Sequence, residues 1–171
     1  PGGGADLEVW ILGSSLFGAE LAGMMGLPFA FASHFAPALL AEAVEIYRRS
    51  FRPSERLKRP RLMLGVNVVA ADSDEEAALL LTSLQQAFVS LRSGNPTRLP
   101  PPVPGFAERL TPPQAALLDG VLACAAVGSP ETVRGRLESL SARTRADELI
   151  LTSQIYDHAA RLRSFEIAAR L

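Results

Sequence analysis

Four apolar runs of strand length alternate with helix-like segments along this chain of 171 residues. The runs are rich in β-branched and aromatic residues, as strands are. They are LEVWILG (7–13), PFAFASHF (28–35), LMLGVNVVAA (62–71) and ADELILTSQI (146–155). Because the third run is too continuously apolar for a strand with one wet face, we expect it in a buried parallel sheet. Strands that alternate with helices predict a parallel α/β fold with right-handed crossovers.

Helices are predicted from apolar periodicity and from end signals. Gly26 ends the first helix, because glycine tolerates the left-handed conformation found at helix C-termini. Ser73 with Glu76 forms a capping box for a long helix, and Ser129 caps another in which Pro130 takes the first position. The predicted helices span 14–26, 37–51, 72–91, 129–144 and 156–171.

A proline-rich stretch interrupts this pattern. We predict that residues 94–110 form an insertion loop within a single domain spanning 1–171, since strands and helices resume after it. The segment TPPQAALLDGVLACAAV (111–127) is expected to form a short helix on this insertion. Proline-rich sequence also forms polyproline II ligands for partner domains, so that role stays open.

The charge balance argues against two classes of partner. Seventeen basic and eighteen acidic side chains leave a net charge of −1. No global field therefore attracts nucleic acid or an anionic membrane surface. The longest apolar stretches are interrupted well before the about 20 residues of a membrane span, and no signal peptide is recognised. The sequence thus predicts neither nucleic acid nor a membrane as partner.

Cys124 is the only cysteine. An internal disulfide or a thiolate zinc cluster therefore cannot form, and a cytoplasmic location is expected. Because Cys124 lies in an apolar run, we expect a buried, unreactive thiol. The chain begins with PGGG, which we expect to be flexible. This start is explained either by removal of an initiator Met or by a cut inside a longer polypeptide.

The candidate ligand site lies where the predicted strands end, since parallel α/β proteins bind ligands at the carboxyl edge of the sheet. Gly13, Ser14 and Ser15 follow the first strand, and Gly18 and Ala19 begin a helix. Free N–H groups at a helix N-terminus, with hydroxyls beside them, suit a phosphate or carboxylate. A capped helix in a tight turn explains the same residues. The loop matches neither a Walker A motif nor GxGxxG.

Two further polar residues lie in or after the predicted strands. His34 follows the second strand. A neutral imidazole there either donates a hydrogen bond to a cofactor ring, acts as a general acid or base, or only packs. Asn67 lies in the middle of the third run. Because a buried Asn must be hydrogen-bonded, it either bridges the backbone across the sheet or reaches a ligand.

Other polar residues have structural explanations. Asp157 is predicted to cap the last helix. The buried face of that helix is expected to hold Leu162, Phe165 and residues 167–169. The acidic cluster DSDEE (72–76) favours helix capping and compensation of the helix dipole over a metal site. No metal is therefore expected.

Several hydrolase motifs are missing from the sequence. It contains no GxSxG elbow, no HExxH, and no pair of acidic residues at two strand ends of the kind used for glycoside chemistry. Hydrolase interpretations therefore rank below one in which a bound cofactor brings the chemistry.

Long segments of the chain resemble a known family. VWILGSSLFGAELAGMMGLPFAFASHFAP is similar to the middle of the bacterial-luciferase-like, flavin-dependent oxidoreductases. NVVAADSDEEA, VGSPETV and ADELILTSQIYDHAARLRSFEIAA resemble the closing segments of that family in the same order. The resemblance covers essentially the whole chain.

The resemblance implies both a fold and a chemistry. Members are (β/α)8 TIM barrels that use FMN, and many of them activate O2 to oxygenate a small organic substrate. The resemblance therefore implies an FMN-dependent monooxygenase, and it leaves open whether a flavin reductase is a partner. The four predicted strands would be strands five to eight of the barrel, with the proline-rich insertion between strands seven and eight.

The resemblance also assigns site residues. His34 would face the pocket as the candidate catalytic residue. Many relatives carry a hydroxyl residue where this chain has Gly18, so one hydrogen bond to the FMN phosphate would be lost here. The expected cofactor-binding residues are Gly13, Ser14, Ser15, Gly18, Ala19 and Asn67.

The chain is too short for a whole barrel, which needs about 250 residues. A half-barrel leaves two sheet edges and an apolar interior uncovered. We therefore expect either the C-terminal half of a longer protein or a homo-oligomer that hides these surfaces. The alternative function is a non-catalytic module that binds phosphate or flavin, or that serves assembly, and that lacks oxidoreductase activity.

Overall fold

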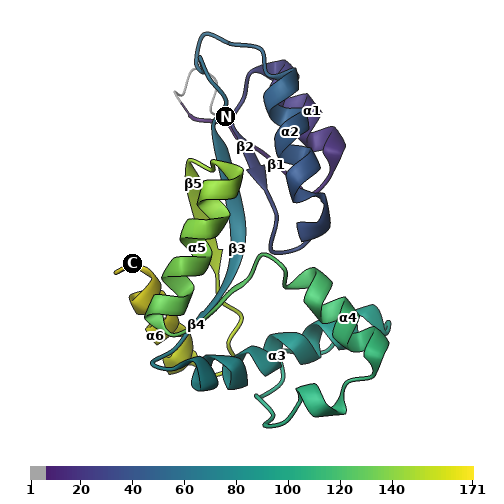
Figure 1. Cartoon of the computed structure of the whole chain (residues 1–171). Helices are drawn as coiled ribbons and strands as arrows, with labels where there is room; N and C mark the ends of the chain where they lie inside the picture. Colours follow the sequence, from purple (N-terminus) through teal and green to yellow (C-terminus); the bar gives the residue numbers. More distant parts are fainter. Residues whose placement is uncertain (1–6) are drawn as a thin grey trace.

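The computed structural model describes residues 7–171, so the predicted flexible PGGG segment lies outside the described residues. The chain forms a parallel sheet with helices packed against it, which confirms the predicted parallel α/β class (Figure 1). β3 is the central strand: β2 and β5 pair with it on opposite sides, and β1 pairs with β2. The strands are β1 (Ile11–Gly13), β2 (Phe29–Phe31), β3 (Leu62–Ala70), β4 (Ala126–Gly128) and β5 (Glu148–Thr152).

Six α-helices occur within residues 7–171, and two short 3-10 turns, Pro37–Leu39 and Ala107–Arg109, precede α2 and α4. Within the same residues, no helix combines the length and the apolar character that crossing a membrane requires. The helices are α1 (Leu16–Met25), α2 (Leu40–Ser50), α3 (Asp74–Arg92), α4 (Pro112–Val121), α5 (Pro130–Thr144) and α6 (His158–Ala168).

Local signals in the sequence explain where these helices begin and end. Gly26 closes α1 in the left-handed conformation, with φ at 62°. The Ser73, Ser129 and Asp157 side chains each accept a hydrogen bond from the backbone N–H three residues further on, at the starts of α3, α5 and α6. These four predicted ends are therefore confirmed.

The prediction of one helix over 111–127 is wrong at its end. α4 stops at Val121, and residues Ala126–Gly128 form β4, a strand that the sequence did not suggest. The physical reason lies in β3, which is longer than either of its neighbours. β2 and β5 pair only with residues 62–67, so the end of β3 needs another partner for its backbone groups. β4 supplies that partner at Val68–Ala70.

The proline-rich insertion is attached to α3. The Val103 N–H donates to Thr82 Oγ1 at 2.8 Å, and Gln86 Nε2 donates to the Pro101 carbonyl at 3.0 Å. α4 also packs against α3. The insertion and its helix therefore extend away from the sheet as one arm (Figure 1).

The pairing registers decide which side chains share a face of the sheet. Gly65 is level with Ile150, and Asn67 is level with Thr152. Paired residues of parallel strands point to the same face, and successive residues of one strand point to opposite faces. Leu64 therefore points away from Gly65 and Asn67, into the main core.

The main core lies between the sheet and α1, α2, α5 and α6. Tyr47 of α2 is fully buried there, and its ring packs 5.3 Å from that of Phe29 in β2. The Tyr47 hydroxyl accepts a hydrogen bond from the Arg61 N–H at 3.0 Å and lies 3.0 Å from the Leu27 carbonyl. Burial raises the pKa of Tyr47. α2 is thereby tied to the entries of β2 and β3.

The opposite face of the sheet, which we call the open face, carries Leu12, Gly65, Asn67 and Ile150. Leu12 in β1 is 71% exposed and Ile150 in β5 is 54% exposed, although both are large apolar residues in strands. Leu12 and Ile150 lie in β1 and β5, each of which pairs with a single neighbouring strand. An uncovered apolar face between two free edges is the geometry expected of a half-barrel.

Two residues of the predicted buried face of α6 are exposed. Leu162 is 50% and Phe165 is 38% exposed, whereas Ile167 is buried in the core. The buried residues of α6 are Ser164, whose Oγ accepts from the Ala70 N–H of β3 at 2.9 Å, and Ile167, so Leu162 and Phe165 lie on other sides of the helix.

Candidate functional site

The predicted site residues meet at the carboxyl edge of the sheet. The Ala32 N–H donates to the Gly13 carbonyl at 2.9 Å, which joins the loops that follow β1 and β2. His34 lies in the second of these loops. Asn67 lies beside it in β3, where its Nδ2 donates to the His34 carbonyl at 3.0 Å. Ser14 and Ser15 directly follow Gly13, so the structure places all of these residues on neighbouring strand ends.

The loop after β1 is a capped helix start. Ser15 Oγ accepts from the Gly18 N–H at 3.3 Å, and the Ser15 carbonyl lies 3.4 Å from the Ala19 nitrogen that donates to it. A Cβ at either Gly13 or Gly18 would lie 3.8 Å from the Cα of the other, so the loop is compact. Ala19 itself is fully buried. The N–H groups of Gly18 and Ala19 are thus used within the turn, and the groups before them remain at the helix tip.

The charge at this helix tip differs from that at two other helices. The first turns of α3 and α5 contain acidic residues, whereas that of α1 contains none. The positive end of the α1 dipole is therefore left uncompensated by its own side chains. Such an end attracts an anion.

The His34 ring packs directly on the Cα of Gly65 in β3, where any side chain would occupy the same space. A Cβ at Gly65 would collide with His34 Nδ1 and would come within 2.8 Å of Cε1. Sequence reasoning missed Gly65. The signal was available, because a glycine inside an apolar strand often marks the close approach of another group.

Two hydrogen bonds fasten the His34 segment to β3. Ser33 Oγ donates to the Gly65 carbonyl at 2.6 Å, and Asn67 donates to the His34 carbonyl. Asn67 Oδ1 also accepts from Thr152 Oγ1 in β5 at 3.0 Å. Asn67 therefore joins three parts of the sheet, which is the bridging role that the sequence left as one of two alternatives.

The acidic cluster serves the structure. Asp72 pairs with Arg163 at 2.7 Å. Asp74 accepts from the Ser129 N–H at 2.7 Å and from Thr132 Oγ1, so it caps α5 from outside that helix. The Ser129 N–H, followed by the Thr132 hydroxyl, lowers the pKa of Asp74. Within residues 7–171, no three His, Cys, Asp or Glu side chains are grouped so as to hold a metal ion.

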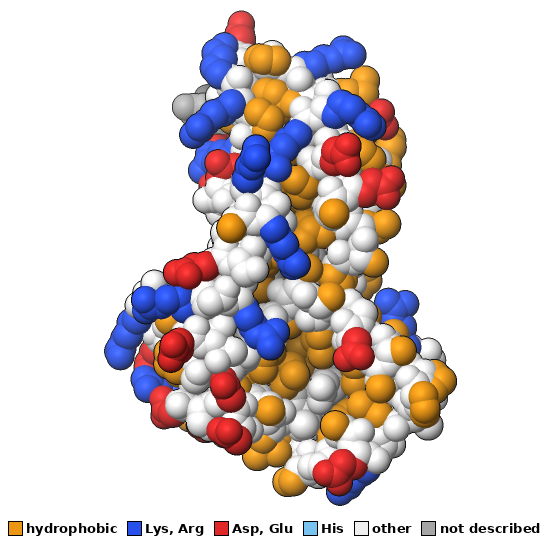
Figure 2. Space-filling view, viewed as in Figure 1, with side chains coloured by type: hydrophobic (Ala, Val, Ile, Leu, Met, Phe, Trp, Pro, Cys, Tyr) orange, Lys and Arg blue, Asp and Glu red, His pale blue; other side chains and the backbone are white. Residues whose placement is uncertain are grey.

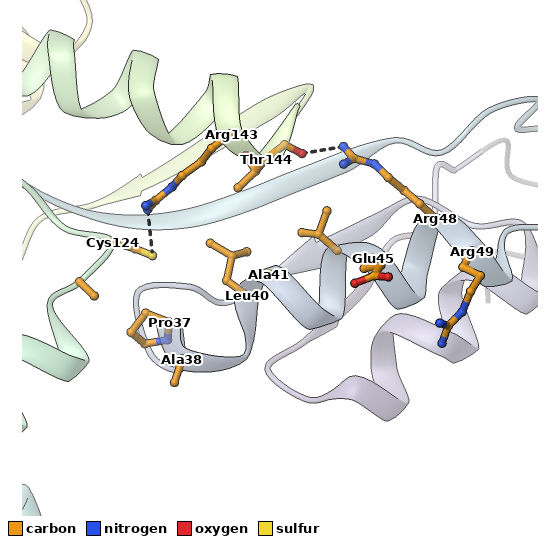
Figure 3. Close-up of a pocket in the computed structure, with 12 residues that line it drawn as sticks. Pro37, Ala38, Leu40, Ala41, Glu45, Arg48, Arg49, Cys124, Arg143 and Thr144 are labelled. Carbon is orange, nitrogen blue, oxygen red and sulfur yellow. Dashed lines mark hydrogen bonds between the residues drawn. The ribbon is translucent and has the colours of Figure 1, made fainter.

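A cavity of about 800 Å³ lies on the helix side, between α2 and α5 (Figures 2 and 3). None of the predicted site residues lines it. Arg48 on its rim donates to the Thr144 and Arg145 carbonyls and so caps the end of α5. Arg143 points to Cys124 Sγ at 3.9 Å (Figure 3). Cys124 is buried as predicted, and burial raises the pKa of its thiol.

These features define half of a parallel (β/α) barrel with a polar carboxyl edge. The family model for luciferase-like monooxygenases matches residues 1–148. The chain belongs to this family.

One curated relative is the "Luciferase-like monooxygenase" of Escherichia coli strain K12. It is 48% identical over 168 residues, which cover 98% of this chain and 50% of that protein. Among solved structures, apo-MsnO8 is 33% identical with a TM-score of 0.83, over 94% of this chain and 49% of that one.

A second solved structure shows likeness in fold alone. The oxygenating constituent of 3,6-diketocamphane monooxygenase from Pseudomonas putida, in complex with FMN, is 23% identical with a TM-score of 0.64. It is matched over 99% of this chain and 49% of that chain. The chain thus spans about half the length of the relatives that it matches.

Proposed function

We propose that this chain is the FMN-binding C-terminal half-barrel of a monooxygenase that uses O2 to oxygenate a small organic molecule. Membership of the luciferase-like family supports this proposal, as does the FMN in the 3,6-diketocamphane monooxygenase structure. The observation that carries it is the N-terminus of α1, whose first turn holds no acidic residue. It follows the loop after β1, which the Ala32–Gly13 hydrogen bond joins to the loop that holds His34.

The residues at this edge fit the phosphate of FMN. The hydroxyls of Ser14 and Ser15 and the first N–H groups of α1 are donors, and Gly13 and Gly18 add no bulk to the loop. Ala19 contributes by closing the first turn. When bound, FMN would supply the electrons for the reaction with O2.

His34 is the proposed catalytic residue, because its ring lies on the open face next to this loop. Asn67 was expected to bind the cofactor directly. Its two hydrogen bonds instead support an indirect contribution, in which it holds His34 in place. The protein's part in the reaction is to anchor the flavin, orient the ring toward His34 and exclude water.

We also propose that the open face is covered in the functional protein. Leu12 and Ile150 on this face are large, exposed apolar residues, and Leu162 and Phe165 of α6 add exposed apolar surface elsewhere on the half-barrel. The relatives are twice as long, so an N-terminal half-barrel is the proposed cover, and a second copy of the chain is the other arrangement that hides the same surface. We further propose that a flavin reductase is a partner of this protein and that the protein is cytoplasmic.

The test compares FMN with riboflavin, which lacks the phosphate. Replacing Ser14 and Ser15 together by alanine is expected to remove about 1–3 kcal/mol of FMN binding, roughly a 5- to 150-fold rise in Kd. Riboflavin affinity should stay unchanged. Flavin fluorescence on titration measures both values.

A matched control is Ser73→Ala. Ser73 caps α3 with the same geometry as Ser15, at 3.2 Å against 3.3 Å, but lies in a different loop. It should leave FMN affinity unchanged. Equal affinity of the unaltered chain for FMN and riboflavin would contradict the phosphate site. The O2-uptake assay needs a protein whose open face is covered by the N-terminal half-barrel. FMN binding without flavin-dependent O2 uptake in that protein would favour the alternative function, a non-catalytic module.

A further inference from the structure

His34 contacts the sheet through one ring nitrogen. Its Nδ1 is buried against Gly65 and has no hydrogen-bond partner among residues 7–171. Nε2 also makes no hydrogen bond there, but it is accessible to solvent on the open face. The two nitrogens of the ring are therefore in different environments, and only Nε2 is available to a ligand.

The contact with Gly65 distinguishes a bare nitrogen from a protonated one. The direction in which a Cβ would project from Gly65 is taken by one of its two α-hydrogens, so this C–H bond points at Nδ1. A lone pair on Nδ1 accepts such a weak C–H contact. An N–H at Nδ1 would instead press two hydrogens together and leave a buried donor without an acceptor.

We propose that Gly65 holds His34 as the neutral tautomer that is protonated on Nε2. The imidazole then acts on the open face as a hydrogen-bond donor. It is not a general base, because its one lone pair is buried.

The ligand atom that such a donor recognises is an acceptor, and the proposed function offers the carbonyl oxygens and unprotonated nitrogens of the flavin ring. This part of the inference rests on the proposed function. The tautomer does not, since it follows from contacts within the chain.

Gly65 and Asn67 are positioning residues in this scheme. The Asn67 amide holds the His34 carbonyl, and the Ser33 hydroxyl holds the Gly65 carbonyl, so the loop is fastened to β3 on either side of the ring. The backbone is thereby fixed while Gly65 sets the contact that selects the tautomer.

Ring-nitrogen NMR of the flavin-free chain tests the tautomer. The chain has only two histidines, so a His158→Gln variant assigns the signals. In alkaline solution, Nδ1 of His34 should show the shift of an unprotonated nitrogen and Nε2 that of a protonated one. A cross-relaxation peak should join the His34 Hε1 proton to a Gly65 α-proton.

A Gly65→Ala variant should abolish that contact and move the His34 ring signals toward those of a free imidazole. Gly135→Ala is the matched control, because a Cβ at Gly135 meets nothing within 4 Å. A His34 ring protonated on Nδ1, or averaged between tautomers in the unaltered chain, would overturn the inference. That result needs no substitution, so a Gly65→Ala chain that fails to fold leaves the test intact.

Adding FMN tests the ligand. Binding should shift the Nε2–H signal of His34 while Nδ1 stays unprotonated. FMN that binds without moving Nε2 would overturn the flavin as the acceptor. A chain that shows the expected tautomer but binds no FMN would contradict the proposed function and leave the tautomer standing.

Discussion

Replacing Asn67 by alanine is expected to destabilise this chain even when no flavin is present. The side chain is only 2% exposed and makes two hydrogen bonds, to the His34 carbonyl and from the Thr152 hydroxyl, both at 3.0 Å. Each such bond contributes about 1 kcal/mol net, and a buried group left without its partner costs about 1–3 kcal/mol. We therefore expect Asn67→Ala to lower the free energy of unfolding by about 2–3 kcal/mol.

Thr152→Val is the matched partner variant, because it removes only the bond to Asn67 Oδ1. It should cost about 1 kcal/mol. The double variant should cost about 1 kcal/mol less than the sum of the two, since both remove the same bond. Urea unfolding followed by circular dichroism gives these differences, and each 1 kcal/mol should lower Tm by about 2–4 °C in a chain of this size.

The reasoning would be refuted if Asn67→Ala left the flavin-free chain as stable as the unaltered one while FMN affinity fell. Asn67 would then be a cofactor ligand and not a bridge. Strict additivity of the two substitutions would likewise show that the Asn67–Thr152 bond contributes nothing.

Two further substitutions probe how the site is supported. Tyr47→Phe keeps the ring but removes the hydroxyl that joins the Leu27 and Arg61 backbones. Thermal unfolding should show that the free energy of unfolding falls by about 1–3 kcal/mol. Tyr156 is exposed, so Tyr156→Phe should leave the free energy of unfolding unchanged. Asp74→Asn should lower stability at pH 7, because the folded-state pKa of Asp74 is depressed. That stabilisation is present above the unfolded-state pKa of about 4 and is lost as the pH falls through the lower folded-state pKa. The difference in unfolding free energy between Asp74→Asn and the unaltered chain should therefore disappear in acid. A difference that does not change with pH would contradict this role of Asp74.

Signals within a few residues were enough to predict most of the fold. The four apolar runs became β1, β2, β3 and β5, and the caps at Ser73, Ser129 and Asp157 became helix starts. Both are local effects, in which side-chain spacing or a single hydrogen bond decides the outcome. β4 was missed because its three residues become a strand only where the far end of β3 needs a partner.

Contacts between distant parts of the chain were not predictable in the same way. The helical period of α6 groups Leu162 with Phe165, but it does not say how far neighbouring elements cover them, and Leu162 is 50% and Phe165 38% exposed. Likewise His34 and Gly65 were both visible in the sequence. The contact of the His34 ring with the Cα of Gly65 became evident only in the structure, where the loop after β2 lies over β3.

The position of His34 couples ligand binding to the covering of the open face. Its Nε2 donor is directed to a surface that this chain alone leaves to water, where a hydrogen bond gains little over the one that it replaces. A cover on Leu12 and Ile150 would remove that water and strengthen the same hydrogen bond in a drier environment. By linkage, a flavin bound at His34 must then favour the covered state by the same factor by which the cover favours flavin. Flavin affinity should therefore rise when an N-terminal half-barrel is added, and a Gly65→Ala substitution should reduce that rise more than it reduces the binding of the cover itself.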